Sequence, residues 1–141
     1  GSIEYSANGL PENITPDNFR LKDKLIVKLD EWAENLENGT GVVMIDNFPI
    51  EGLSRVQIAT AYLGLSSYMG QWVPQSSAGL RSESRGFGLP MGEVRAEMKG
   101  ATPTKGRQAN NYFRLHTDRC DCISLLGIRT AKAGGHTRIC S

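Results

Sequence analysis

Two sets of apolar residues repeat at helical spacing in the first half of the chain. The first set steps by four, three and four residues and comprises Leu25, Leu29, Trp32 and Leu36. The second set repeats the same steps and comprises Ile58, Tyr62, Leu65 and Met69. Residues at this spacing share one face of a helix, so each set predicts an amphipathic helix that buries this face against a β-sheet. The apolar run between them, Val42 to Ile45, predicts a buried strand.

The ends of these helices have recognisable sequence signals. Gly39 follows the first apolar set and is a typical C-terminal cap. Ser54, with Gln57 three residues later, is a capping-box pattern at the start of the second helix. Gly70 predicts the end of that helix. The first 70 residues therefore predict a helix, a strand and a helix.

The second half of the chain is different in character. Residues from Gln71 to about Gln108 mix Gly, Ser, Pro and charges, which predicts a long loop region. Two apolar segments, Ile123 to Ile128 and Thr137 to Cys140, are strand-like, and Ala133-Gly134-Gly135 between them predicts a turn. The sequence thus indicates an α+β protein with an irregular segment over residues 1–20 and one domain over residues 21–141.

Composition excludes several classes of function. The 141 residues carry a net charge of +1, so no strong field attracts nucleic acid or an acidic membrane surface. The longest nearly unbroken apolar run is far too short to span a bilayer. Three cysteines crowd toward one end, an odd number that does not suggest a secreted disulfide scaffold. We therefore expect a cytoplasmic protein that binds neither nucleic acid nor membranes.

The tripeptide His116-Thr117-Asp118 is the strongest chemical signal in the chain. Residues two apart on a strand project to the same side, so an imidazole nitrogen and a carboxylate oxygen would face one point. Those two groups are part of the 2-His-1-carboxylate ligand set of non-haem iron oxygenases. The alternative for this short motif is a surface histidine beside an acidic turn.

Flanking residues extend this motif over more than 20 positions. They are Phe113 to Asp118, Asp121, Leu125-Leu126, Ala131-Lys132, and Gly134 to Arg138. In order and spacing they resemble the taurine dioxygenase (TauD/TfdA-like) family of Fe(II)/2-oxoglutarate-dependent dioxygenases. The likeness covers roughly Leu25 to Ser141 and is most specific from His116 to Arg138.

The resemblance implies a fold and a set of functional residues. The fold would be N-terminal helices packed on part of a double-stranded β-helix, or jelly-roll, with the barrel incomplete in this chain. His116 and Asp118 would bind Fe(II), and Thr137 would help to hold 2-oxoglutarate. Asn111 and Tyr112 would face the substrate, a small molecule. The reaction would be a hydroxylation or related oxidation that releases CO2 and succinate, and the carboxylate of Asp118 favours it over halogenation.

Two parts of the family pattern are missing from the sequence. A second iron-binding His and an Arg that pairs with 2-oxoglutarate should lie on later strands. Only 25 residues follow His116 (141 − 116), whereas a jelly-roll needs about eight strands. We therefore expect a truncated or partial chain, inactive alone, that self-associates or pairs with a missing C-terminal half through its open strand edges.

Two other functions compete with the oxygenase. Five potential zinc ligands, His116, Cys120, Cys122, His136 and Cys140, fall within 25 residues and could form a structural zinc site. A non-catalytic binding module of the same fold is the second alternative. Iron content together with 2-oxoglutarate binding would separate the three.

Overall fold

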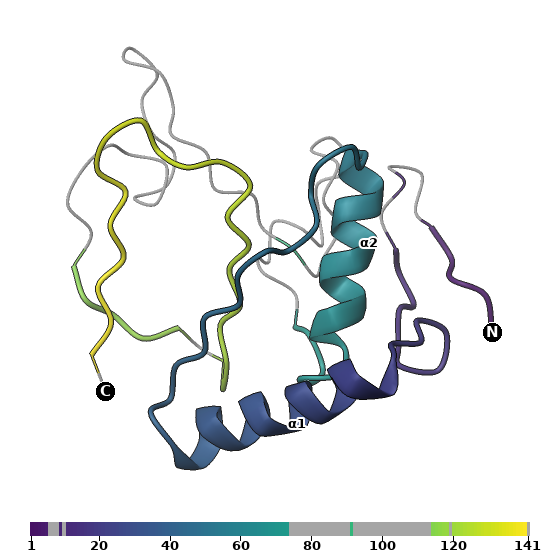
Figure 1. The fold of residues 1–141 in the computed structure, drawn as a ribbon, viewed down its shortest axis with the longest axis horizontal. Helices are drawn as coiled ribbons and strands as arrows, with labels where there is room; N and C mark the ends of the chain where they lie inside the picture. Colours follow the sequence, from purple (N-terminus) through teal and green to yellow (C-terminus); the bar gives the residue numbers. More distant parts are fainter. Residues whose placement is uncertain (6–8, 10, 74–90, 92–113, 119, 141) are drawn as a thin grey trace.

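The computed structural model describes residues 1–5, 9, 11–73, 91, 114–118 and 120–140. In this part of the chain two helices form, α1 (Asp23–Asn38) and α2 (Arg55–Ser66). Helix α1 lies along the bottom of the view in Figure 1, and α2 rises above its N-terminal end. Turns, bends and segments without regular secondary structure make up the remaining described residues. An isolated bridge joins Tyr5 to Pro11. Neither described helix is long and apolar enough to cross a membrane.

The predicted apolar face of α1 is confirmed. Leu29 is only 2% exposed, whereas Val27, on another face of the helix, is 57% exposed. The three other members of the set, Leu25, Trp32 and Leu36, are half-buried. The sheet expected beneath this face is not formed by the described residues, which contain no β-strand. The spacing thus predicted which side chains are covered but not what covers them.

Asn35 closes the C-terminal end of α1. Its carbonyl oxygen accepts hydrogen bonds from the N–H groups of Gly39 and Gly41, each at 3.1 Å. Its side-chain oxygen accepts from the Thr40 N–H at 3.0 Å, and its Nδ2 donates to the Val42 carbonyl at 3.3 Å. A Cβ at position 39 would collide with the Asn35 side chain, so Gly39 is the predicted cap for a steric reason.

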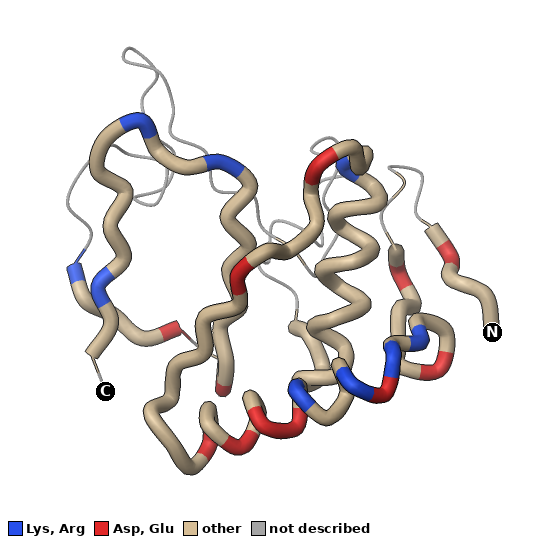
Figure 2. Tube along the Cα trace, in the orientation of Figure 1, with Lys and Arg blue, Asp and Glu red and all other residues tan. Residues whose placement is uncertain are grey.

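The charges along α1 do not stabilise its C-terminal end, so the hydrogen bonds of Asn35 matter more there. Figure 2 shows lysines near the start of α1 and acidic residues gathered toward its end. The last turn holds no basic residue. Because the C-terminal end of a helix carries partial negative charge, Glu34 and Glu37 oppose the helix dipole there. Hydrogen bonds from Asn35 stabilise an end that the surrounding charges do not.

The start of α2 agrees with the sequence prediction. The Ser54 side chain accepts a hydrogen bond from the Gln57 N–H at 3.3 Å, and the Gln57 side chain accepts from the Ser54 N–H at 2.8 Å. This is the predicted capping box. The predicted end at Gly70 is wrong, because α2 ends at Ser66. After the helix, the backbone N–H groups of Tyr68 and Met69 donate to carbonyl oxygens three residues earlier, as in tight turns.

The buried face of α2 differs from the predicted one. Its buried residues are Ala59, Leu63 and Gly64, whereas the predicted inward residues Ile58, Tyr62 and Leu65 are half-buried. Phe19 explains the difference. Its ring lies so close to Gly64 that a Cβ there would overlap three ring atoms. The N-terminal segment therefore covers the Gly64 side of the helix, and a glycine carries no hydrophobic signal that could have shown it.

Tyr68 fixes the same N-terminal segment from just beyond α2. Its hydroxyl oxygen accepts from the Leu21 N–H at 3.3 Å and lies 2.9 Å from the Phe19 carbonyl, to which it donates. Ile14 in this segment is only 2% exposed. The irregular N-terminal segment thus contributes to the small core with Leu29, Ala59 and Leu63.

The three predicted strands lack sheet pairing in the described residues. Val42 to Ile45 is extended, but Met44 is 92% exposed, so the prediction of a buried strand is wrong. Residues 123–127 and 137–140 are also extended and largely exposed. A strand needs a neighbouring backbone to bond its N–H and C=O groups, and no described segment supplies one. The jelly-roll remains a prediction, and most of the predicted Gln71–Gln108 loop lies outside the described residues.

Replacing Leu29 with Ala should destabilise the protein. Leu29 is fully buried, so its truncation removes apolar contacts and leaves a cavity, at a cost of about 2–5 kcal/mol in the free energy of unfolding. Urea denaturation followed by circular dichroism measures this. The matched control is Val27→Ala on the exposed face of α1, expected to change stability by less than about 0.5 kcal/mol. If both substitutions lowered the free energy of unfolding equally, Leu29 would not lie on the buried face of α1.

Replacing Asn35 with Ala should also lower stability, by about 1–2 kcal/mol. The variant loses the side-chain bonds to Thr40 and Val42 that close α1. Asn38→Ala is the control, because the Asn38 side chain bonds only to the exposed Glu34 carboxylate among the contacts described here. Thermal unfolding of both variants checks this. A larger loss in Asn38→Ala would show that the Asn35 bonds do not stabilise the helix end.

Candidate metal centre

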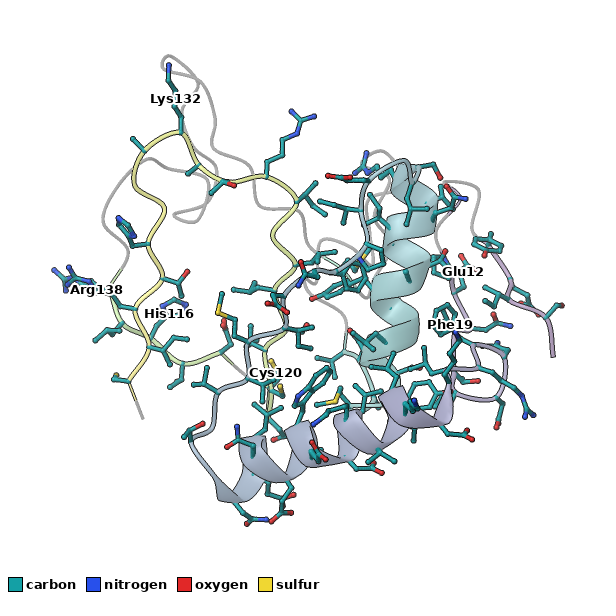
Figure 3. The ribbon with its side chains drawn as sticks, in the orientation of Figure 1. Glu12, Phe19, His116, Cys120, Lys132 and Arg138 are labelled. Atoms are coloured by element: carbon teal, nitrogen blue, oxygen red, sulfur yellow. The ribbon has the colours of Figure 1, made fainter. Side chains whose placement is uncertain are left out.

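His116 and Asp118 lie on an extended, exposed segment. Residues 114–118 have no helical or strand hydrogen bonding, and all five are exposed. Figure 3 shows His116 on this segment, outside the two helices. In extended backbone, side chains two residues apart project to the same side. Their spacing thus supports the predicted pair of ligands, a nitrogen from His116 and an oxygen from Asp118, which stays a prediction.

A backbone contact sets the tautomer of His116. Its Nδ1 lies 2.9 Å from the Arg114 carbonyl oxygen. A carbonyl oxygen can only accept, so Nδ1 carries the proton and the neutral ring has its lone pair on Nε2. Metal-binding histidines commonly donate their second ring N–H to a backbone carbonyl in this way. His116 thus fits a metal ligand that binds through Nε2.

The described residues do not complete a metal site. No group of three His, Cys, Asp or Glu side chains comes close enough in this part of the chain to hold an ion. His116 and Asp118 nevertheless supply the nitrogen and oxygen donors that Fe(II) takes from proteins. They fit two positions of its coordination sphere, and a third protein ligand would come from outside the described residues.

The zinc alternative is not supported. All five of its residues, His116, Cys120, Cys122, His136 and Cys140, lie in the described part of the chain, and no three of them form a cluster. The three thiols are free, with Cys120 half-buried and the other two exposed. Structural zinc requires four ligands around one point. In the described structure these five residues therefore do not form a four-ligand zinc site.

Thr137 lies shortly after two glycines whose backbone is left-handed. Gly134 and Gly135 have φ of 73° and 74°, the left-handed region that glycine adopts most readily. A Cβ on Gly135 would also lie 2.9 Å from the Ala131 Cβ. The chain bends at Lys132 and Ala133, so the predicted turn over Ala133-Gly134-Gly135 is confirmed at Ala133 alone. Figure 3 labels Lys132 at this bend. Thr137 is exposed, and its contact with 2-oxoglutarate remains a prediction.

The predicted substrate-facing residues, Asn111 and Tyr112, lie outside the described residues. The structure therefore does not place them relative to His116 and Asp118. Their assignment remains a prediction from the resemblance.

The sequence patterns did not predict a junction between α2 and the chain that follows the candidate ligands. The Tyr62 hydroxyl of α2 donates to the Ser124 Oγ at 2.8 Å. The Tyr62 ring also meets the Phe48 ring edge-on, with centroids 6.4 Å apart and planes at 81°. We call these three residues the Tyr62 junction. It joins α2 to the segments around Phe48 and Ser124, and a contact between residues 62 positions apart leaves no local sequence signal.

Burial shifts the ionisation of Tyr62. Partial removal from water disfavours the phenolate and raises the pKa of Tyr62 above its ordinary value of 10.0. The hydrogen bond to Ser124 acts in the opposite direction, and the charge of a nearby Cys122 thiolate raises the pKa further. The hydroxyl therefore remains a proton donor throughout the neutral range.

The chain has sequence similarity to a biosynthetic enzyme. A Streptomyces rubellomurinus protein named FR-33289 synthase is 32% identical over 116 residues, which cover 79% of the chain and 31% of that protein. The chain thus spans about a third of the length of this relative. No family model matches the sequence, and no solved structure matches it.

The stability that Tyr62 contributes should depend on pH in a defined direction. Its folded pKa is raised, so this stability is fully present below pH 10.0 and is lost as pH rises through the folded value. The Tyr62→Phe variant has no hydroxyl at this position, so it has no group that ionises there. The stability advantage of the wild type over the variant, about 1 kcal/mol at pH 8, should therefore shrink by about pH 11. Urea denaturation at both pH values checks this, and a constant difference would contradict it.

Proposed function

We propose that this chain forms part of an Fe(II)/2-oxoglutarate-dependent dioxygenase of the TauD/TfdA-like family and supplies two of its iron ligands, His116 and Asp118. The observation that carries the proposal is the hydrogen bond from His116 Nδ1 to the Arg114 carbonyl at 2.9 Å. It leaves the ring lone pair on Nε2, one of the two ring nitrogens through which a neutral histidine can bind a metal. Similarity to a protein named as a synthase agrees with an enzymatic function.

Each proposed residue has a separate task. The bound iron and 2-oxoglutarate would supply oxidation of a small molecule by O2, with release of CO2 and succinate. The Nε2 of His116 would hold the metal on one side, while the Asp118 carboxylate would hold it and offset its positive charge. The Thr137 hydroxyl, beside two glycines that allow close approach, would donate to a carboxylate of 2-oxoglutarate. Asn111 and Tyr112 would contact the substrate.

The proposed enzyme needs groups that this sequence lacks. A second iron-binding His and an Arg for 2-oxoglutarate would come from a further part of the protein, in keeping with a relative about two and a half times as long. The exposed apolar side chains of the extended segments support the same proposal. Leu125 is 74% exposed and Ile139 is 65% exposed. Both would be covered when these segments pair as strands of a jelly-roll, within one longer chain or between copies.

Two further aspects of the proposal concern location and partners. The three cysteines are free thiols, which suits the reducing conditions of the cytoplasm. A net charge of +1 gives no attraction to nucleic acid, so the proposed partner is a small-molecule substrate.

Alanine substitutions at the proposed ligands test the function. In the full-length protein, His116→Ala and Asp118→Ala should each lower iron-dependent succinate formation by more than about 100-fold, because changes to the outer shell alone cost about 10–100-fold. Anaerobic Fe(II) titration and detection of succinate by mass spectrometry measure binding and turnover. His136→Ala, an exposed histidine 20 residues beyond His116 (136 − 116), is the matched control and should retain activity.

The outcomes separate the candidate functions. Wild-type turnover in both ligand variants would reject the assignment of His116 and Asp118. Binding of 2-oxoglutarate without any succinate formation by the full-length protein would indicate the non-catalytic module instead.

A further inference from the structure

We propose that Tyr62 is a positioning residue for the metal-binding segment. Through its hydrogen bond to Ser124 it holds the chain that leads away from Asp118 against α2. The inference rests on the proposed function, since it takes His116 and Asp118 to be the iron ligands. It adds a residue from a distant helix that neither the motif nor the resemblance assigns.

The first step of the argument is that the Tyr62 hydroxyl is itself held in place. Tyr62 lies in the middle of α2, a helix whose first turn is closed by the capping box of Ser54 and Gln57. Its ring is half-buried and packs edge-on against Phe48. A tyrosine side chain has only two main rotatable bonds, and packing of the ring restricts both. The hydroxyl is therefore a fixed donor on a stable element.

The second step is that the Tyr62 bond reaches Ser124, in the chain shortly after the proposed iron ligands. Ser124 lies six residues after Asp118 (124 − 118), so the extended backbone between them spans at most about 20 Å. Cys122 lies close enough for its charge to act on the Tyr62 hydroxyl, which places a second residue of this stretch at the junction. Cys120, nearer to Asp118, is half-buried whereas residues 114–118 are exposed. The bond thus restrains the chain at a point six residues beyond Asp118.

The third step concerns what the restraint provides. His116 and Asp118 lie on extended backbone that has no sheet pairing in the described residues, so regular secondary structure does not fix their position. A metal ion binds more tightly when its ligands are already held near the required geometry. A single hydrogen bond from α2 reduces the freedom of this segment before the metal arrives.

Tyr68 offers a matched comparison within the same region. Its hydroxyl also makes hydrogen bonds, part-buried ones, but with Phe19 and Leu21 in the N-terminal segment. Tyr62 and Tyr68 both extend from α2 or the turn after it, and each loses only a hydroxyl on replacement by Phe. The two substitutions therefore distinguish general destabilisation from displacement of the metal-binding segment.

The experiment measures Fe(II) affinity and stability in the full-length protein. Tyr62→Phe and Ser124→Ala should each weaken anaerobic Fe(II) binding by about three- to tenfold, the range of one net hydrogen bond. The double variant should bind no more weakly than either single variant, because both remove the same bond. Ser124→Thr keeps the hydroxyl and should retain wild-type affinity. Tyr68→Phe should lower the unfolding midpoint without changing Fe(II) affinity.

Specific results would overturn the inference. Wild-type Fe(II) affinity in both Tyr62→Phe and Ser124→Ala, with binding lost in His116→Ala, would reject Tyr62 as a positioning residue and leave the proposed function intact. An equal loss of affinity in Tyr68→Phe would attribute the effect to stability alone and reject it too. Wild-type affinity in His116→Ala would reject the proposed function, and the inference with it.

Discussion

The ring of Phe19 lies directly against α2 at Gly64, an approach that any side chain at this position would block. This contact holds the N-terminal segment on one side of α2. Tyr68 strengthens it through hydrogen bonds to the backbone on either side of Arg20. The small core of Ile14, Leu29, Ala59 and Leu63 depends on that arrangement, because the segment and the two helices each contribute to it. In the described part of the chain few apolar side chains are buried, Pro11 among them, so each matters to the stability of the whole.

Helix α2 therefore links two halves of the chain that are distant in sequence. On one side it holds the N-terminal segment through Gly64 and Tyr68. Its Tyr62 hydroxyl reaches Ser124, in the region that follows the candidate iron ligands. The chemistry proposed for His116 and Asp118 thus takes place on exposed backbone whose position depends on a helix made of ordinary core residues. The Tyr62 hydroxyl is the group that connects this helix to the chain after the proposed ligands.

Local interactions were predictable from the sequence, and long-range ones were not. The face of α1, the cap at Gly39 and the capping box at Ser54 follow from residues a few positions apart. The buried face of α2 could not be predicted in this way, because Phe19 covers Gly64 and a glycine gives no hydrophobic signal. Val42 to Ile45 has strand propensity, but propensity alone supplies no partner backbone. His116 was predicted to be a ligand from its motif, while its tautomer required the position of the Arg114 carbonyl.

The distance in sequence between Tyr62 and Ser124 has a consequence for the order of folding. The capping box of α2 closes over three residues, so this helix can form early and at little entropic cost. The Tyr62–Ser124 bond closes a loop of 62 residues, and such contacts form only after that entropy has been lost. The junction should therefore be absent from the folding transition state. Its loss would accelerate unfolding while leaving the rate of folding nearly unchanged.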